Sequence, residues 1–122
     1  MGSLILTTQE AVKYGHDVLG GKAWNMAWLS RNGFPVPQWC VLTTDAFVRQ
    51  INVCGIEAFI AEQVAKLDAS LPADQIGVIA EAIQNEIMKH PLDAEIRAAI
   101  TAALPADKLA SQFYAVRSSV VG

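Results

Sequence analysis

The sequence predicts an α+β fold that is rich in helix and contains a few short strands. Stripes of isoleucine, alanine and leucine recur at helical spacing between residues 45 and 104. Short apolar runs at 4–6, 39–42 and 112–117 have the length of strands. With 122 residues, 52% of them hydrophobic and 17% charged, the chain is long enough to form one globular domain or a piece of one.

The first part of the chain is expected to form a strand, a helical turn and a helix. A strand over 4–6 is followed by Thr7 or Thr8, either of which can cap a brief helical turn. Gly20-Gly21 breaks the chain, and apolar residues at helical spacing predict a helix over 22–31. The Asn-Gly pair and the prolines that follow end this helix.

The remaining elements are a strand, four helices and a last strand. The strand over 39–42 leads to Thr43-Thr44-Asp45, which caps a helix running toward Gly55. Prolines separate the three later stripes from one another. Each stripe predicts one helix, and their residues are Ile56, Phe59, Ile60, Val64 and Leu67; Ile76, Ile79, Ala80, Ile83 and Ile87; and Ile96, Ala99, Ile100, Ala103 and Leu104. Asp93 is the candidate cap of the last helix, and 112–117 is the last strand.

Composition limits the classes of partner and the compartment. The formal net charge of −3 argues against a broad basic surface for nucleic acid or anionic lipid. No apolar run approaches the ~18 residues of a membrane-crossing helix, and the N-terminus lacks the basic flank of a signal peptide. Cys40 and Cys54 lack the spacing of metal ligands and are too few for a disulfide framework. We expect a cytoplasmic protein with reduced thiols, no metal ligands in this chain and no nucleic-acid or membrane partner.

The stretch Gly20-Gly21-Lys22 is the first candidate binding site. Glycines let backbone amides approach a ligand, and a helix N-terminus presents unpaired N–H groups with partial positive charge. A lysine at that point adds an ammonium group suited to phosphate oxygens. A P-loop is excluded, because its first glycine would fall on His16 and its magnesium-binding hydroxyl on Ala23. Taken alone, the stretch is better explained as a plain turn.

The stretch Ala115-Val116-Arg117-Ser118-Ser119 is the second candidate. An arginine that ends an apolar strand and precedes two hydroxyls presents a planar guanidinium group, which suits phosphate. The alternative is a surface arginine that pairs with a carboxylate before a polar turn. For this stretch alone, the alternative is again favoured.

The two stretches together resemble the ATP-binding domain of the pyruvate phosphate dikinase and phosphoenolpyruvate synthase family, which includes the rifamycin phosphotransferases. In that family Gly-Gly-Lys opens a helix that ends at Gly-Φ-Pro-Val-Pro (Φ apolar), before a strand and Thr-Thr. Helices then lead to Phe-Ala-Val-Arg-Ser-Ser. This chain has LGGKAWNMAWLSRNGFPVPQWCVLTTDAF at 19–47 and FYAVRSSVVG at 113–122, in the same order.

The resemblance implies a role for each matching residue. Lys22 matches the lysine that contacts the phosphates of ATP, and Gly20-Gly21 shapes the approach of the nucleotide. Arg117 matches the catalytic arginine that stabilises charge on the transferred phosphoryl group. Ser118-Ser119 borders the site. Such roles suit phosphoryl transfer, which depends on positioning and charge neutralisation.

The resemblance also implies a larger enzyme. Residues 1–122 would be the N-terminal portion of an ATP-grasp-like ATP-binding domain, with a helical segment over 45–104. In the intact enzyme, ATP gives AMP and phosphate while a phosphoryl group passes through a histidine on another domain to pyruvate or to a small-molecule hydroxyl. The implied cofactors are ATP and Mg²⁺, and the magnesium ligands are expected outside this chain. The chain alone should turn over ATP poorly, and its implied partners are the remaining domains and the phosphoryl acceptor.

Some points stay open at this stage. After Ser-Ser the family often has Ala-Thr and an acidic pair, whereas this chain has Val120-Val121-Gly122, so the subfamily and the acceptor are undecided. His16 and His90 lack the glycine- and serine-rich surroundings of the family's phosphoryl-carrying histidine, and we expect them to be capping or solvated residues. Whether the chain is a fragment is also open. The alternative function is a helical interaction module that kept the family scaffold without catalysis.

Overall fold

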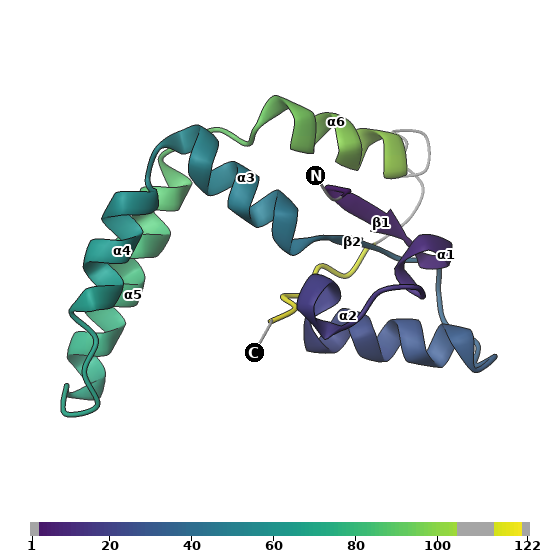
Figure 1. The fold of residues 1–122 in the computed structure, drawn as a ribbon, viewed down its shortest axis with the longest axis horizontal. Coiled ribbons are helices and arrows are strands. Elements are labelled where there is room, and N and C mark those ends of the chain that lie inside the picture. The colour runs from purple at the N-terminus through teal and green to yellow at the C-terminus, as the bar shows by residue number, and fades with distance from the viewer. Residues whose placement is uncertain (1–2, 105–113, 121–122) are drawn as a thin grey trace. The chain divides into compact units, whose positions relative to one another are not determined.

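The computed structural model describes residues 3–104 and 114–120 of the chain. This part holds a two-stranded sheet and six helices, which confirms the helix-rich α+β class. The elements in chain order are β1 (Ile5–Thr7), α1 (Thr8–Ala11), α2 (His16–Arg31), β2 (Cys40–Leu42), α3 (Thr44–Cys54), α4 (Glu57–Ala65), α5 (Ala73–Met88) and α6 (Ala94–Ala103) (Figure 1). The chain divides into two compact units, which we call unit 1 (Met1–Val48 with Ala94–Gly122) and unit 2 (Arg49–Asp93).

The sheet of unit 1 joins the two predicted N-terminal strands. β1 and β2 run antiparallel, and the start of α1 is attached beside them. The Thr8 hydroxyl donates a hydrogen bond to the Trp39 carbonyl at 2.8 Å and accepts one from the Trp39 amide at 3.1 Å. The register places Ile5 opposite Leu42, Leu6 opposite Val41 and Thr7 opposite Cys40.

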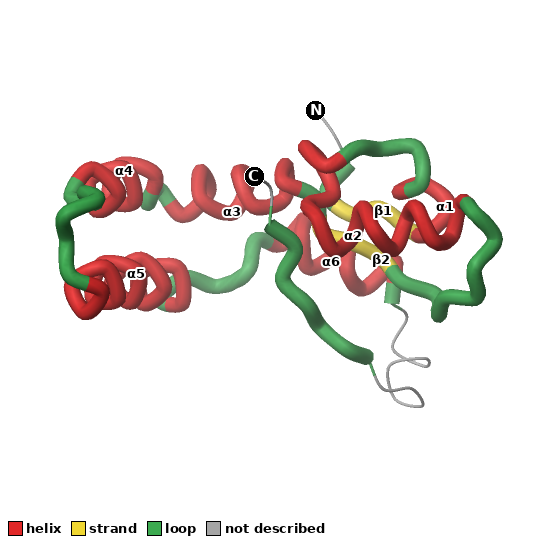
Figure 2. The backbone as a smooth tube through the Cα atoms, turned by 90° about the horizontal axis from the view of Figure 1, so that it is seen from below, coloured by secondary structure: helices red, strands yellow, loops and turns green. Residues whose placement is uncertain are grey.

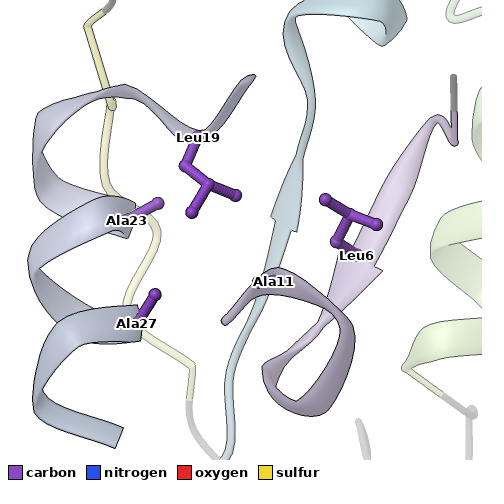
Figure 3. Packing of buried hydrophobic residues seen from close by; sticks show 5 residues of the cluster. All are labelled: Leu6, Ala11, Leu19, Ala23 and Ala27. Atoms are coloured by element: carbon purple, nitrogen blue, oxygen red, sulfur yellow. The ribbon is translucent and has the colours of Figure 1, made fainter. Parts of the chain in front are cut away.

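The core of unit 1 forms where α1 and α2 cover this sheet. Small alanines on one face of α2 allow the helix to approach the sheet closely, and Leu6 and Leu19 fill the space between them (Figure 3). α6 also contacts β1, and Ile96 of α6 is buried. The buried cluster consists of Leu6, Ala11, Leu19, Ala23 and Ala27.

Two of the three tryptophans contribute to this core. Trp24 and Trp39 are half-buried and pack against the cluster. Trp28 is 42% exposed and stacks on Phe34, with ring centroids 6.1 Å apart.

Unit 2 is built around a helical hairpin. α4 and α5 contact each other and lie side by side in both views (Figures 1 and 2). Ile51 in α3 and Ile56, which precedes α4, are buried, whereas α5 contributes no buried residue. Arg49 and Asp93, the first and last residues of the unit, form an ion pair with Nε and Oδ2 2.6 Å apart.

The predicted strand over 112–117 was wrong where the structure describes it. Residues 112 and 113 lie outside the described residues, and 114–117 form no strand. Val116 is 90% exposed, so its side chain does not pack as it would in a covered strand. A strand needs a hydrogen-bonded neighbour. The residues that follow this segment, Ser119 and Val120, bond to α2 instead, as described below.

The helices of the described part are all too short or too polar to cross a membrane.

Candidate functional site

A kink at Gly20 divides α2 into two parts. Gly20 has φ 75° and ψ 171°, a conformation that is essentially restricted to glycine. The predicted break is therefore confirmed at Gly20, but Gly21 is helical. The helix predicted over 22–31 is confirmed to within one residue, because the helix after the kink begins at Gly21. The helical turn before the kink was not predicted; it starts at His16, and the Leu19 amide there bonds to the Gly15 carbonyl at 3.1 Å.

The kink brings His16 onto Trp24. Residues eight apart in a straight helix are separated by roughly 12 Å along the axis. Here the two rings stack with centroids 4.3 Å apart and an interplanar angle of 18°. His16 is exposed, which agrees with the solvated alternative, whereas its contact with Trp24 could not be read from helical spacing.

The C-terminal segment docks on this kink. The Ser119 hydroxyl donates a hydrogen bond to the Leu19 carbonyl at 2.7 Å and accepts one from the Ala23 amide at 3.1 Å. The Gly21 amide donates to the Val120 carbonyl at 3.0 Å. Figure 1 shows this yellow segment beside the N-terminal part of α2. The structure thus brings together the two sequence stretches that carry the family resemblance, although they lie about 100 residues apart.

The contact at Gly20 leaves no room for a side chain. A Cβ atom added at Gly20 would lie 2.5 Å from Ser119 Oγ and 2.8 Å from the carbonyl carbon and oxygen of the same residue. Gly21 is different, because the nearest atom to a Cβ placed there is the Val120 carbonyl oxygen at 4.0 Å. Of the two adjacent glycines, Gly20 is therefore the one that both the backbone conformation and the packing require.

The chain itself uses two of the backbone amides that a helix N-terminus would offer to a ligand. The sequence predicts that backbone amides at the start of this helix bind phosphate. In the structure, however, the Gly21 amide donates to the Val120 carbonyl and the Ala23 amide donates to the Ser119 hydroxyl. An anion at this point would therefore rely chiefly on cationic side chains.

The two predicted cations flank this contact. Lys22 lies between Gly21 and Ala23, and Arg117 lies two residues before Ser119. Summing covalent lengths and the 3.1 Å hydrogen bond, the two Cα atoms are at most roughly 15 Å apart. That separation is within the combined reach of a lysine and an arginine side chain.

Lys22, Arg117 and the neighbouring Ser118 are all exposed. Within the described residues, Lys22 and Arg117 form no ion pair or side-chain hydrogen bond. Both charged groups are therefore available to an incoming anion.

The other candidate groups lie apart from this contact. His90 belongs to unit 2, where its Nε2 atom is 3.6 Å from the Glu86 carboxylate. Hydrogen bonding from Lys89 lowers the pKa of Glu86. Cys40 and Cys54 are free, and partial burial raises the pKa of the Cys40 thiol, which disfavours the reactive thiolate.

A metal site and a surface groove are the two remaining kinds of candidate site. In the described part of the chain, no group of three or more His, Cys, Asp or Glu residues could hold a metal ion, so these residues do not fit a magnesium site. Unit 2 contains a groove of about 380 Å³ that includes none of the predicted site residues. Its lining consists of Gln63, Lys66, Leu71, Gln75, Val78, Ile79 and Ala82.

Comparison with known proteins agrees with the pairing of these two stretches. The chain is 29% identical over 97 residues to the phosphoenolpyruvate synthase of Aeropyrum pernix, an alignment that covers 80% of this chain and 12% of that protein. No solved structure matches the chain. Residues 16–122, which include both stretches, match the family described as pyruvate phosphate dikinase, AMP/ATP-binding domain. The chain therefore belongs to the pyruvate phosphate dikinase AMP/ATP-binding domain family.

Proposed function

We propose that this chain is the N-terminal portion of the nucleotide-binding domain of a dikinase-type phosphotransferase, and that ATP binds where the C-terminal segment meets the kink of α2. The observation that carries this proposal is the docking of Ser119 and Val120 on α2. It supports a single site because Lys22 and Arg117 each lie within two residues of that contact.

In this proposal Lys22 and Arg117 have different roles in binding the polyphosphate. Lys22 supplies a mobile ammonium group that neutralises phosphate oxygens. Arg117 supplies a planar guanidinium group that donates hydrogen bonds to two phosphate oxygens side by side and stabilises the charge that develops on the transferred phosphoryl group. Gly20-Gly21 shapes the backbone beside the nucleotide, and Ser118-Ser119 borders the site.

For the intact enzyme we propose the reaction that the family resemblance implies. The chain spans 12% of the relative it matches, so the rest of the reaction belongs to other parts of a longer enzyme. There ATP and one water give AMP, inorganic phosphate and a phosphorylated histidine on another domain. That phosphoryl group then passes to pyruvate or to a small-molecule hydroxyl. Magnesium would be held by ligands outside this chain.

The test is a calorimetric titration of the 122-residue chain with ATP. Lys22→Ala and Arg117→Ala should each weaken binding by about tenfold, since a hydrogen bond to a charged group contributes about 1.5 kcal/mol or more. Both residues are exposed, so the free energy of unfolding should not change.

Matched controls are available elsewhere on the surface. Lys66→Ala and Arg97→Ala remove an exposed lysine and an exposed arginine that lie outside both motifs, and they should leave the affinity for ATP unchanged. If the wild-type chain binds no ATP, or if the two site variants bind as tightly as the controls, the proposal is wrong. The non-catalytic scaffold is then the better explanation.

A further inference from the structure

The helix that follows the kink lacks a capping side chain of its own. Its first residue is Gly21, so Gly20 occupies the position where serine, threonine, aspartate or asparagine usually accepts a hydrogen bond from a helix amide. No such side chain fits at position 20. The backbone conformation there favours glycine, and a Cβ would overlap Ser119.

Ser119 makes the bond that residue 20 cannot make. A capping hydroxyl normally accepts from the second or third amide of the helix, and Ser119 Oγ accepts from Ala23, the third residue after the kink. The same hydroxyl donates to the Leu19 carbonyl, which belongs to the turn before the kink. One side chain from a remote segment therefore holds both sides of the break in α2.

This bond also fixes the place of the segment that carries Arg117. The Arg117 side chain is exposed, and only Ser118 lies between it and Ser119. We infer that Ser119 is a positioning residue: it caps α2 from a remote part of the chain and thereby holds Arg117 near Lys22 for the phosphates of a nucleotide. The inference rests on the proposed function, but it assigns Ser119 a bond within the protein, in place of a contact with ligand.

A double-mutant cycle between Ser119 and Arg117 separates positioning from general support of the fold. ATP affinity is measured by calorimetry for the wild type, Ser119→Ala, Arg117→Ala and the double variant. Loss of a cap corresponds to roughly tenfold in an equilibrium constant. Ser119→Ala should therefore weaken ATP binding by about that factor in the wild type, and should have no further effect once Arg117 is absent.

Ser119→Thr keeps the hydroxyl and should restore most of the affinity. An equal loss on Ser119→Ala in both backgrounds would overturn the inference, because Ser119 would then act without Arg117. Full retention of affinity in Ser119→Ala would overturn it as well.

Hydrogen exchange without nucleotide tests the cap independently of ATP. In Ser119→Ala the Ala23 amide should exchange roughly tenfold faster than in the wild type. The matched control is Ser70→Ala, which removes an exposed serine hydroxyl bonded to Asp68 in unit 2 and should not change exchange at Ala23.

The two readouts distinguish the possible failures. If the Ala23 amide exchanges at the same rate in Ser119→Ala as in the wild type, Ser119 is not a cap, and the inference is wrong whatever the affinity for ATP. Faster exchange in a chain that binds no ATP would contradict the proposed function and the positioning role, and would leave Ser119 as a cap alone.

Discussion

The two units of the chain differ in how their residues are held in place. In unit 1, buried side chains and hydrogen bonds join segments that are far apart in sequence, as between Thr43 and Ser3 or between Ser119 and Leu19. In unit 2, α5 buries no residue, and the Arg49–Asp93 pair closes the ends of the unit. Both predicted motifs lie in unit 1. The candidate site therefore depends on long-range contacts, which single substitutions can break.

The largest expected effect is at Gly20. Gly20→Ala combines backbone strain with overlap against Ser119, so we expect unit 1 to lose about 4 kcal/mol of unfolding free energy. Chemical denaturation followed by tryptophan fluorescence measures this loss, because Trp24, Trp28 and Trp39 all belong to unit 1.

Gly33→Ala is the matched control for this prediction. Gly33 also has a positive φ, of 80°, but nothing lies within 4 Å of an added Cβ. Its cost should be about 1 kcal/mol, from the backbone alone. Equal losses in the two variants would show that Ser119 does not occupy the space over Gly20.

The next effect compares a leucine of each unit. Leu6 is 1% exposed in the core of unit 1, and Leu6→Ala should cost about 3 kcal/mol through lost burial and a cavity. Leu67 in unit 2 is 45% exposed, and Leu67→Ala should cost about 1 kcal/mol or less. Fluorescence follows the first variant and far-ultraviolet circular dichroism the second. Similar losses would remove the contrast between the units.

Unit 2 should be most sensitive at its closing ion pair. The Asp93 side chain is 8% exposed and accepts hydrogen bonds from the Arg49 guanidinium group, so Asp93→Asn replaces the charged acceptor of a largely buried pair with a neutral one and should cost about 2 kcal/mol. Circular dichroism during denaturation measures this cost. Glu86→Gln removes a pair with Lys89, whose side chain is 68% exposed, and should shift the unfolding midpoint less than Asp93→Asn does. If both variants unfold at the same denaturant concentration as the wild type, the Arg49–Asp93 pair does not hold the ends of unit 2 together.

The smallest effect is a pH dependence at α1. Hydrogen bonds from the Thr7 side chain and then from the Thr7 backbone lower the pKa of Glu10 below its ordinary value of 4.5. Since the folded-state pKa is lowered, the contribution to stability is present above pH 4.5 and is lost as the pH falls through the folded-state pKa. Carboxyl titration by NMR should show this low pKa, and Thr7→Val should raise it toward 4.5. An unchanged pKa in that variant would exclude the hydroxyl as the main cause.

Much of the fold could be predicted from the sequence, because local patterns determine most of its elements. The isoleucine stripes place α4, α5 and α6 correctly, and the apolar runs before α1 and α3 place β1 and β2. The pattern failed at 114–117, since apolar alternation cannot show whether a neighbouring strand exists.

The candidate site was harder to predict from the sequence. Order along the chain suggested that Lys22 and Arg117 belong together, but the bonds of Ser119 to Leu19 and Ala23 join residues about 100 positions apart, which periodicity cannot detect. One local signal could have indicated them. A glycine at a capping position leaves an amide without an acceptor, so the acceptor has to come from another segment or from a ligand.

The most direct test is an ATP titration of the isotope-labelled chain followed by amide NMR shifts. If Lys22 and Arg117 share one polyphosphate, the signals of 21–23 and of 117–119 should move together, with the same dissociation constant, while the signals of α5 in unit 2 stay in place. Shifts confined to one of the two segments, or shifts centred on the groove of unit 2, would contradict a shared nucleotide site at the kink of α2.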